Sequence, residues 1–403
     1  MPSGIGRFFY SQFFVTPPKP GGDLTGKTVI VTGSNVGLGK EAARHFAALN
    51  ASTVILAVRS PEKGEAARKE IETSTSRDNV VKVMQLDMSS YTSVLDFASR
   101  ASKELSRIDI AVLNAGVNRG VWEVFEQDES TITVNVVSTF LLAFALLPKL
   151  RETAQKFNTR PTLTVVSSEV HEWATFDERN APEGEIFKRL NDKVIGGKEV
   201  SLNNRYQVSK LMEVLSIRAF CERNTVERVP VTVNAVNPGF CHSEFGREQP
   251  SILAFFRLLL ARTTEVGSRT LVHAGMSGAE SHGKYLSDAQ ITEPSAYVRS
   301  DEGKKDGERV WRELLGRLEE IHGGVTEGLL RSCSAITWAV IEIHHPTFHL
   351  KTARKALRPD EAKRRTGPPY FTNNLYPEHL AGDDRASKQA VGFLKRFSDD
   401  RVC

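Results

Sequence analysis

The sequence predicts an α/β fold with a doubly wound, mostly parallel sheet. Residues 29–31 form a β-branched apolar run that leads through a glycine-rich turn into a helical pattern. Similar strand patterns then alternate with helical patterns as far as residue 236. Parallel strands joined by helices have right-handed crossovers, which place helices on both faces of the sheet. Polar residues follow the carboxyl ends of several strands, where such folds bind ligands.

The individual elements are recognised by their apolar periodicity and by the glycine and polar residues that end them. The predicted strands cover residues 29–31, 53–58, 80–86, 108–113, 162–166 and 231–236. The predicted helices cover residues 40–49, 62–73, 93–105, 132–150 and 205–223. A polar insertion, residues 174–204, comes before the last of these helices.

The chain has 403 residues, enough for one large domain with extensions. We predict an N-terminal extension at 1–23, a main domain at 24–330 and a C-terminal tail at 331–403. The tail contains 13 Lys and Arg against 8 Asp and Glu, whereas the rest of the chain is nearly neutral. Its prolines and weak apolar periodicity predict a charged linker or disorder, with a docking role as the less favoured alternative.

Composition excludes several classes of protein. A net charge of +4 is small for this length and does not indicate nucleic-acid binding. Cys221, Cys241, Cys333 and Cys403 form no C-x-x-C pair and no metal-like cluster, so we expect no metal site and a reduced, cytoplasmic protein. The longest apolar run, residues 140–147, is shorter than the ~18 residues of a membrane span and predicts a buried helix segment.

The N-terminal extension is rich in aromatic residues. Five of them lie close together: Phe8, Phe9, Tyr10, Phe13 and Phe14. They either cover an apolar patch on the main domain or touch a membrane surface. We favour the first alternative, because a short segment with one arginine is a poor membrane anchor.

The glycine turn after the first strand predicts a dinucleotide site. Gly33 allows a tight exit from the strand, Gly37 lets the backbone approach a pyrophosphate, and Gly39 lets the helix pack close to the sheet. The free N–H groups of the helix would face the phosphates. An ordinary βα turn is the alternative, but the flanking strand and helix favour the dinucleotide. The candidate cofactor residues here are Gly33, Ser34, Asn35, Val36, Gly37, Leu38 and Gly39.

Two charged residues follow the second and third strands. NAD-specific folds place an acidic residue near the end of the second strand, whereas this chain has Arg59. A guanidinium would attract the 2′-phosphate of NADP, although Arg59 could instead pair with Glu62 on the surface. Asp87 could accept a hydrogen bond from the adenine amino group, or could be the N-cap of the following helix.

Tyr206 and Lys210 are four residues apart on one predicted helix, so they lie on the same face one turn apart. A neighbouring ammonium favours the phenolate and would lower the pKa of Tyr206 from about 10. Such a tyrosine can donate a proton to a carbonyl oxygen or accept one from an alcohol. The pair alone arises often by chance, so the surrounding sequence must support it.

The glycine turn is written T-G-x-x-x-G-x-G, and it precedes Asn114-Ala115-Gly116, Tyr206-x-x-x-Lys210 and Asn237-Pro238-Gly239 in that order. This series resembles the short-chain dehydrogenase/reductase family from about residue 24 to about residue 320. The resemblance implies a Rossmann fold. It also implies that Ser168 hydrogen-bonds the substrate oxygen, with Ser167 as its structural neighbour, and that Asn135 holds a water beside the lysine.

The resemblance also assigns further cofactor contacts. They are Asn114, Ala115, Gly116, Tyr206, Lys210, Pro238, Gly239 and Ser243. Ser243 stands where the family has a threonine that contacts the nicotinamide carboxamide, and it keeps the hydroxyl. For Asn135 a purely structural role in a buried helix is the alternative.

Several phrases resemble the retinol-dehydrogenase-like branch of the family: residues 39–43, 56–60, 166–171 and 205–211. The N-terminal phrase is similar to that of fungal members, many of which reduce ketones or aldehydes in secondary metabolism. Residues 251–261 are apolar and lie where the family builds its substrate lid, or else form a helix packed on the core or in a subunit interface. His171 could line the same pocket, but a lone histidine is more often structural.

Together these observations predict an oxidoreductase that transfers hydride between NADP(H) and a carbonyl or alcohol of a small, lipophilic molecule. Tyr206 would be the general acid/base, with Lys210, Ser168 and Asn135 completing the catalytic group. One alternative is a non-catalytic dinucleotide-binding sensor or scaffold, and another is a nucleotide-sugar epimerase or dehydratase. A homo-oligomer is compatible with the sequence.

Overall fold

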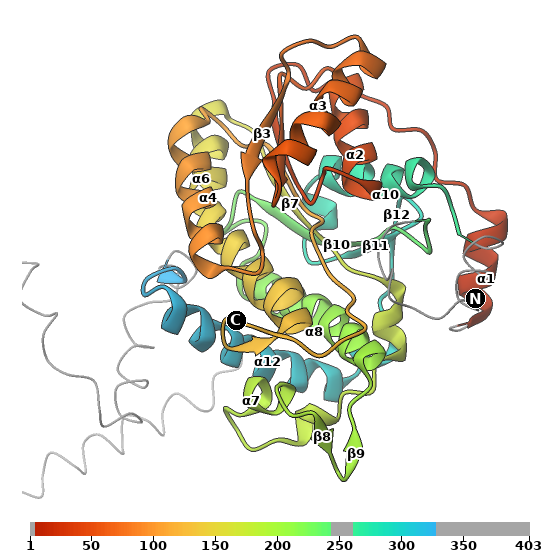
Figure 1. The fold of residues 1–403 in the computed structure, drawn as a ribbon, viewed down its shortest axis with the longest axis vertical. Coiled ribbons are helices and arrows are strands. Elements are labelled where there is room, and N and C mark those ends of the chain that lie inside the picture. Colours follow the sequence, from red (N-terminus) through yellow and green to blue (C-terminus); the bar gives the residue numbers. More distant parts are fainter. Residues whose placement is uncertain (1–4, 243–260, 328–403) are drawn as a thin grey trace, which may run out of the picture. The chain divides into compact units, whose positions relative to one another are not determined.

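The computed structural model describes residues 5–242 and 261–327, and its central sheet contains eight strands (Figure 1). Their order across the sheet is β12-β11-β10-β7-β4-β1-β2-β3. All neighbouring pairs are parallel except β11 and β12, which are antiparallel. The strands are β1 (Thr28–Thr32), β2 (Thr53–Val58), β3 (Val81–Gln85), β4 (Ile110–Leu113), β7 (Thr162–Val166), β10 (Thr232–Asn237), β11 (Tyr285–Ser287) and β12 (Gln290–Thr292). The predicted doubly wound α/β fold is confirmed.

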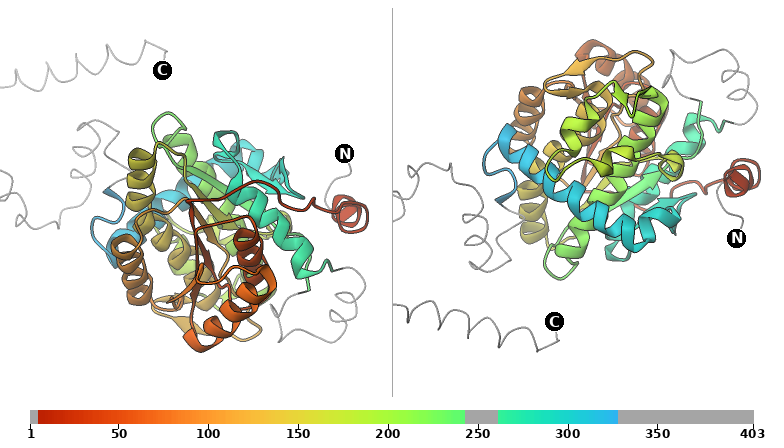
Figure 2. Two further views of the ribbon diagram at one scale, coloured as in Figure 1. Left: turned by 90° about the horizontal axis from the view of Figure 1, so that it is seen from above. Right: turned by 90° about the horizontal axis from the view of Figure 1, so that it is seen from below.

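Helices cover both faces of this sheet, as the views in Figure 2 show. The long helices are α2 (Gly37–Ala48), α3 (Pro61–Thr75), α4 (Tyr91–Glu104), α6 (Thr139–Phe157), α8 (Leu202–Arg223), α10 (Thr264–Met276) and α12 (Asp301–Ile321). Successive strand residues point to opposite faces, so Val29 and Val31 join one core and Ile30 joins the other. The first core contains α2, α3 and α10, and the second contains α4, α6, α8 and α12. Burial on both faces explains the continuous apolar runs of the strands.

The predicted helices α3, α4 and α8 begin slightly earlier than expected because serine side chains cap them. Ser60, Ser90 and Ser201 precede these helices, and each hydroxyl accepts a hydrogen bond from a backbone N–H in the first turn. Ser300 caps α12, which was not predicted, in the same way. The strand pair β11–β12 lies beyond the last predicted strand. Both strands are only three residues long, which is too short for a clear periodic signal.

The predicted helix at 132–150 is longer and less regular than expected. It consists of α5 (Ser130–Ile132), a π-helix η1 (Thr133–Ser138) and α6, which continues past Pro148. By length and composition Ser130–Phe157 could cross a membrane, although its uninterrupted apolar run is only eight residues long. Almost all of it is buried inside the protein, as in the core helix of a globular domain.

The predicted polar insertion folds into short elements: the 3₁₀-helix η3 (Asp177–Asn180), the helix α7 (Ile186–Leu190) and the hairpin β8 (Val194–Ile195) to β9 (Lys198–Glu199). Backbone N–H groups of Gly184 and Ile186 donate to Glu313 and so attach the insertion to α12. The 3₁₀-helix η2 (Glu169–Trp173) precedes the insertion. Another small hairpin, β5 (Val124–Phe125) to β6 (Asp128–Glu129), precedes α5. The remaining short elements are η4 (Ala279–Ser281) and α11 (Ala296–Arg299).

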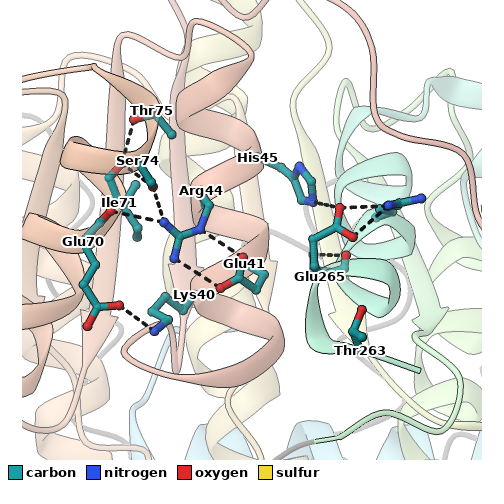
Figure 3. A network of polar contacts seen from close by, with 12 residues as sticks. Lys40, Glu41, Arg44, His45, Glu70, Ile71, Ser74, Thr75, Thr263 and Glu265 are labelled. Carbon is teal, nitrogen blue, oxygen red and sulfur yellow. Dashed lines mark hydrogen bonds and ion pairs between the residues drawn. The ribbon is translucent and has the colours of Figure 1, made fainter. Parts of the chain in front are cut away.

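Polar contacts hold α2 between its two neighbouring helices (Figure 3). On one side Lys40 Nζ lies 2.9 Å from Glu70 Oε2 of α3, and Arg44 donates to the Glu70 carbonyl at 3.2 Å. On the other side His45 Nε2 lies 3.3 Å from Glu265 Oε1 of α10. Burial lowers the pKa of His45, so this contact joins a neutral imidazole to a carboxylate. The helix that follows the glycine turn is therefore fixed on both sides.

The N-terminal extension contains a helix, α1 (Ile5–Phe14), at the margin of the described body (Figures 1 and 2). Phe8 is half-buried and packs against Trp173 and Phe240. The other aromatic residues of α1, namely Phe9, Tyr10, Phe13 and Phe14, are exposed. The prediction that the aromatic cluster covers the body therefore holds for Phe8 and is wrong for the other four.

Contacts divide the chain into two units, Met1–Thr337 and Trp338–Cys403, and all the described residues belong to the first. Ser243, the predicted lid at 251–261 and the tail at 331–403 lie wholly or almost wholly outside the described residues. Within the described residues, no cluster of three or more His, Cys, Asp or Glu side chains could hold a metal ion.

Candidate functional site

The glycine turn connects β1 to α2 in the way that its three glycines suggest. Gly33 has φ +63° and lies so close to Ala115 that a Cβ would sit 3.0 Å from the Ala115 Cα. A Cβ at Gly39 would lie 2.6 Å from both Asn114 Nδ2 and the Gly33 carbonyl oxygen. Gly37, by contrast, has φ +60° and faces open space. No side chain caps the amides of α2, so an anion could approach them past Gly37.

Arg59 and Asp87 follow β2 and β3 at the same edge of the sheet. Arg59 is exposed, and within the described residues it forms no hydrogen bond or ion pair, so the suggested pairing with Glu62 does not occur. Asp87 is half-buried and accepts from Ser89 N at 3.0 Å and from Ser89 Oγ at 2.7 Å. The N-cap of α4 is Ser90, so the alternative in which Asp87 caps that helix is wrong.

The end of β4 is tied to the glycine turn. Asn114 Nδ2 donates to the Thr32 carbonyl at 2.9 Å, and Ala115 N donates to Thr32 Oγ1 at 2.8 Å. Gly116 comes next, and a Cβ there would lie 3.2 Å from Asn135 Oδ1 and 3.8 Å from Lys210 Nζ. These three residues therefore lie between the glycine turn and the residues of α8.

Asn135 is fully buried inside the π-helix η1. Its Oδ1 accepts from Val117 N at 2.8 Å, and its Nδ2 donates to the Val117 carbonyl and to Ser209 Oγ, each at 3.0 Å. Ser209 in turn donates to the Tyr206 carbonyl at 2.7 Å. Asn135 thus connects the segment after β4 to the helix that carries Tyr206. A π-helix is rare and often marks a functional site.

Ser167 and Ser168 follow β7, and their hydroxyls contact different groups. Ser167 is 2% exposed and donates to the Lys210 carbonyl at 3.1 Å. Ser168 is half-buried, and its hydroxyl hydrogen-bonds the Tyr206 side chain. The structure therefore brings Ser168, and not Ser167, next to the Tyr206 hydroxyl.

Tyr206 and Lys210 lie on one face of α8, with the Lys210 Nζ 5.8 Å from the centroid of the Tyr206 ring. The ammonium donates to the Val166 carbonyl and to Glu213 Oε1, each at 2.8 Å. Burial and then the charge of Glu213 raise the pKa of Tyr206, while the Ser168 hydrogen bond lowers it. The expectation of a lowered pKa for Tyr206 is not met, because burial, with the Glu213 carboxylate as a second cause, raises it.

Glu213 is a residue that the sequence analysis missed. Its side chain is almost fully buried, and it forms an ion pair with Lys210 inside the protein. Burial raises the pKa of Glu213 to about 7, although Lys210 and Ser167 oppose the shift. The available signal was its position three residues after Lys210, which puts both side chains on the same helix face.

A second buried ion pair stands at the start of α8. Arg205, next to Tyr206, is completely buried, and its Nη1 lies 2.5 Å from Glu178 Oε1 of η3. The pair joins the polar insertion to α8 immediately before Tyr206. This pair cannot be recognised from the sequence, because the two residues are distant in the chain and a charged residue is normally exposed.

The turn after β10 completes the arrangement. Asn237 Oδ1 accepts from Gly239 N at 3.1 Å and from Glu169 N of η2 at 3.2 Å. This amide holds the Pro238-Gly239 turn against the first residue after Ser168. Gly239 has φ +78°, a conformation that favours glycine. His171, by contrast, is structural: its Nε2 accepts from Ser295 N at 3.1 Å, so its Nδ1 carries the proton toward the Ser168 carbonyl at 2.8 Å.

Except for Ser243, which lies outside the described residues, the predicted site residues thus gather along one edge of the sheet, at the carboxyl ends of β1, β2, β3, β4, β7 and β10. The residues after β1, β2 and β3 form the open part of this edge. Ser168, Tyr206, Lys210 and Asn135 form its buried part, on and around α8. Such an edge can hold a dinucleotide with its phosphates at α2 and its reactive ring near Tyr206.

Comparison with known proteins agrees with this geometry. A family model described as short chain dehydrogenase matches residues 27–157. The chain is 52% identical over 321 residues to the short chain dehydrogenase/reductase dmxR8 of Cryptosporiopsis sp., covering 79% of this chain and 98% of that protein. It is 42% identical over 343 residues to the short-chain dehydrogenase anuD of Penicillium roqueforti, and this match covers 81% of this chain and 85% of that protein.

A crystal structure of an uncharacterised protein from Mycobacterium paratuberculosis has the same fold, with a TM-score of 0.55 and 24% identity over 74% of this chain and 94% of that one. The resemblance to fungal members of the family is confirmed by the sequence relatives. The chain therefore belongs to the short-chain dehydrogenase/reductase family of NAD(P)(H)-binding oxidoreductases.

Proposed function

We propose that this protein uses NADP(H) to interconvert a carbonyl and an alcohol on a small, apolar molecule, as part of fungal secondary metabolism in the cytoplasm. One observation carries the proposal: the Tyr206 side chain hydrogen-bonds Ser168 and has Lys210 on the same helix face. These are the proton donors that such a reaction requires, gathered at the ligand-binding edge of the sheet.

The residues at this edge fit a dinucleotide. Gly37 faces open space beside the uncapped amides of α2, where a pyrophosphate would accept hydrogen bonds. Arg59 is exposed and unpaired within the described residues, so its guanidinium is available for a 2′-phosphate. Asp87, Asn114 and Gly116 follow the neighbouring strands and would contact the cofactor along the same edge of the sheet.

When bound, the cofactor supplies or accepts the hydride. In reduction Tyr206 would donate its hydroxyl proton to the substrate oxygen, and in oxidation it would accept that proton. Ser168 would hydrogen-bond the same oxygen and keep it within reach of Tyr206. Lys210 would bind the ribose and return a proton to Tyr206, while Asn135 would hold the water that passes this proton to Lys210. Its hydrogen bond to Ser209 fixes Asn135 against α8.

The proposed cofactor preference is tested by titrating the purified protein with NADPH and with NADH while following tryptophan quenching. We expect NADPH to bind at least about tenfold more tightly, which corresponds to about 1.4 kcal/mol. Tighter binding of NADH would contradict the role given to Arg59. If neither nucleotide bound, the proposed oxidoreductase function would fail as a whole.

The proposed reaction is tested by following NADPH oxidation with a panel of ketones and aldehydes. Turnover that depends on Tyr206 would support the proposal. Intact NADPH binding without turnover of any carbonyl would favour the non-catalytic sensor. Tightly bound NAD in the purified protein, together with turnover of a nucleotide sugar, would favour an epimerase or dehydratase.

A further inference from the structure

The helix α1 is attached to the turn that follows β10. Gln12 Nε2 donates to the Phe240 carbonyl at 2.9 Å, and Gln12 Oε1 accepts from the Phe240 N–H at 3.1 Å. One side chain thus satisfies both backbone groups of Phe240, two residues beyond Pro238. The fit is close: a Cβ at Gly239 would lie 2.9 Å from the same Gln12 oxygen.

A buried arginine provides a second attachment. Arg262 Nη2 donates to the Ser11 carbonyl at 2.6 Å and to the Val15 carbonyl at 3.0 Å. Asp288 Oδ1 lies 2.7 Å from Arg262 Nη1, and Asp288 Oδ2 accepts from Ser11 Oγ at 2.7 Å. Because this network is largely withdrawn from water, moving α1 away would leave the Arg262 guanidinium without several of its hydrogen-bond acceptors, which is costly for a buried charge.

These attachments bring together three aromatic side chains from distant parts of the chain. The Phe8 ring centroid lies 6.1 Å from that of Trp173 and 6.3 Å from that of Phe240. Trp173 is 40% exposed, and Phe8 and Phe240 are half-buried. The three rings therefore form a partly open aromatic cluster, hereafter the Phe8–Trp173–Phe240 cluster.

The cluster lies next to the proposed reaction centre along the chain. Trp173 ends the short helix η2 that begins immediately after Ser168, and Phe240 follows Gly239. Asn237 joins these two segments, because its side chain accepts from both Glu169 N and Gly239 N. An aromatic surface is thus attached to both sides of the turn that positions Ser168.

We propose that α1 forms part of the substrate site, where the Phe8–Trp173–Phe240 cluster takes an aromatic portion of the carbonyl substrate and Gln12 is a positioning residue for Phe240. This inference rests on the proposed carbonyl–alcohol activity. It names the substrate class as aryl ketones or aldehydes. Partly exposed rings at aromatic-pair distances bind a further ring through ring–ring packing as well as burial, whereas an aliphatic chain gains only from burial.

The outer face of α1 is not part of the proposed aromatic subsite. Phe14 is 76% exposed, and its ring packs near those of Tyr10 and Phe13 on its own helix. It belongs to the same helix and is also phenylalanine, but it does not contact Trp173 or Phe240 within the described residues. Phe14→Ala is therefore a matched control for Phe8→Ala.

The test compares an aryl ketone, 2-acetylnaphthalene, with an aliphatic one, 2-decanone. Binding of each ketone to the full-length protein with NADP⁺ is measured by calorimetry, after NADP⁺ binding to each variant has been verified. We expect Phe8→Ala to weaken 2-acetylnaphthalene binding about fivefold and 2-decanone binding less than about twofold. Phe14→Ala should change neither affinity.

Gln12→Ala provides a second, independent measurement. Loss of the acceptor on Gln12 should accelerate hydrogen exchange at the Phe240 amide. The control variant Phe14→Ala should leave this exchange rate unchanged. If carbonyl turnover is present, the KM for 2-acetylnaphthalene should rise about fivefold while the KM for NADPH stays unchanged. Unchanged exchange, or an equal rise in both KM values, would contradict the positioning role.

The outcomes separate this inference from the proposed function. Equal effects of Phe8→Ala on both ketones, or wild-type protein that binds 2-decanone but not 2-acetylnaphthalene, would overturn the aromatic subsite and leave the oxidoreductase function intact. Wild-type protein that binds NADP⁺ but neither ketone would also overturn the subsite. Failure to bind NADP(H) would overturn both proposals together.

Discussion

The two parts of the ligand-binding edge differ in how their charged residues are held. In the open part, at the ends of β1, β2 and β3, Arg59 is exposed and has no partner within the described residues. In the buried part, on and around α8, Lys210 pairs with Glu213 and Arg205 pairs with Glu178 almost without contact with water. The first part is available for a ligand, whereas the second is already assembled.

The difference shows that charges in the two parts of the edge interact with their surroundings with different strengths. Charges in the buried part interact strongly with their partners, and each unpaired charge there would be costly. Charges in the open part are screened by water and salt, so each contributes little alone. Substitutions should therefore have large, salt-insensitive effects around α8 and small, salt-sensitive effects at the end of β2.

The largest effect is expected for Tyr206→Phe. This change removes the proposed proton donor and keeps the ring, so kcat for carbonyl reduction should fall about 10²–10⁴-fold. The Kd for NADPH should stay nearly unchanged, since only the hydroxyl is lost. Stopped-flow reduction and nucleotide titration measure the two quantities. A fall in kcat of less than about tenfold would show that another group donates the proton.

A large effect on stability is expected for Glu178→Ala. Removing this carboxylate leaves the fully buried Arg205 without its partner, which should lower the free energy of unfolding by about 3–5 kcal/mol. Urea unfolding at two salt concentrations measures the change. Glu302→Ala is the matched control, because Glu302 forms an exposed pair with Arg179 and should contribute only about 0–1 kcal/mol. Similar losses in both variants would remove the contrast between buried and exposed pairs.

The open part of the edge was the easier one to predict from sequence. Strand and helix patterns fixed the places of Arg59 and Asp87, and the spacing of Gly33, Gly37 and Gly39 matched the turn that the structure contains. Local spacing determines such features, so they can be derived without knowledge of distant contacts. Six of the eight sheet strands were predicted for the same reason.

The features that escaped prediction depend on distant contacts or on burial. Glu213 lies at helical spacing from Lys210, but the sequence does not show that this face of α8 is buried. Arg205 finds its partner 27 positions away, in an insertion that looked irregular. Helix α1 depends on Gln12 reaching Phe240, more than two hundred residues later. Sequence periodicity carries no information on such pairs.

A moderate effect on pH dependence is expected for Glu213→Gln. The pKa of Glu213 is raised to about 7, so the carboxyl ionises as pH passes through that value. Ionised Glu213 raises the pKa of Tyr206 and weakens it as an acid. In the wild type, kcat for reduction should therefore fall about tenfold between pH 6 and pH 8, a tenfold change being 1.36 kcal/mol. Glu213→Gln cannot ionise, so its profile should be nearly flat over this window.

The same shift makes a prediction for stability. The pKa of the Glu213 carboxyl is about 7 in the folded state and about 4.3 in the unfolded state, so the folded protein binds more protons between these pH values. The contribution of this group to the free energy of unfolding is therefore full below a pH of about 4.3 and is lost as pH rises to about 7. Glu222→Gln is the control, because Glu222 lies on the same helix and is 41% exposed. A pH–rate profile of Glu213→Gln that still falls near pH 7 would show that another group titrates there.

The smallest effect is expected for Arg59→Ala in the open part. Arg59 is exposed, so its attraction to a 2′-phosphate is partly screened and should contribute only about 1 kcal/mol, or about a fivefold loss of NADPH affinity. NADH lacks that phosphate and should bind the variant and the wild type equally. The loss should shrink further as salt is raised from about 0.05 M to about 0.5 M, because the Debye length falls to a few ångströms and exposed charges are then strongly screened. A loss of NADPH affinity that is independent of salt would mean that Arg59 becomes buried when the nucleotide binds. Charges in both parts of the edge would then be insensitive to salt.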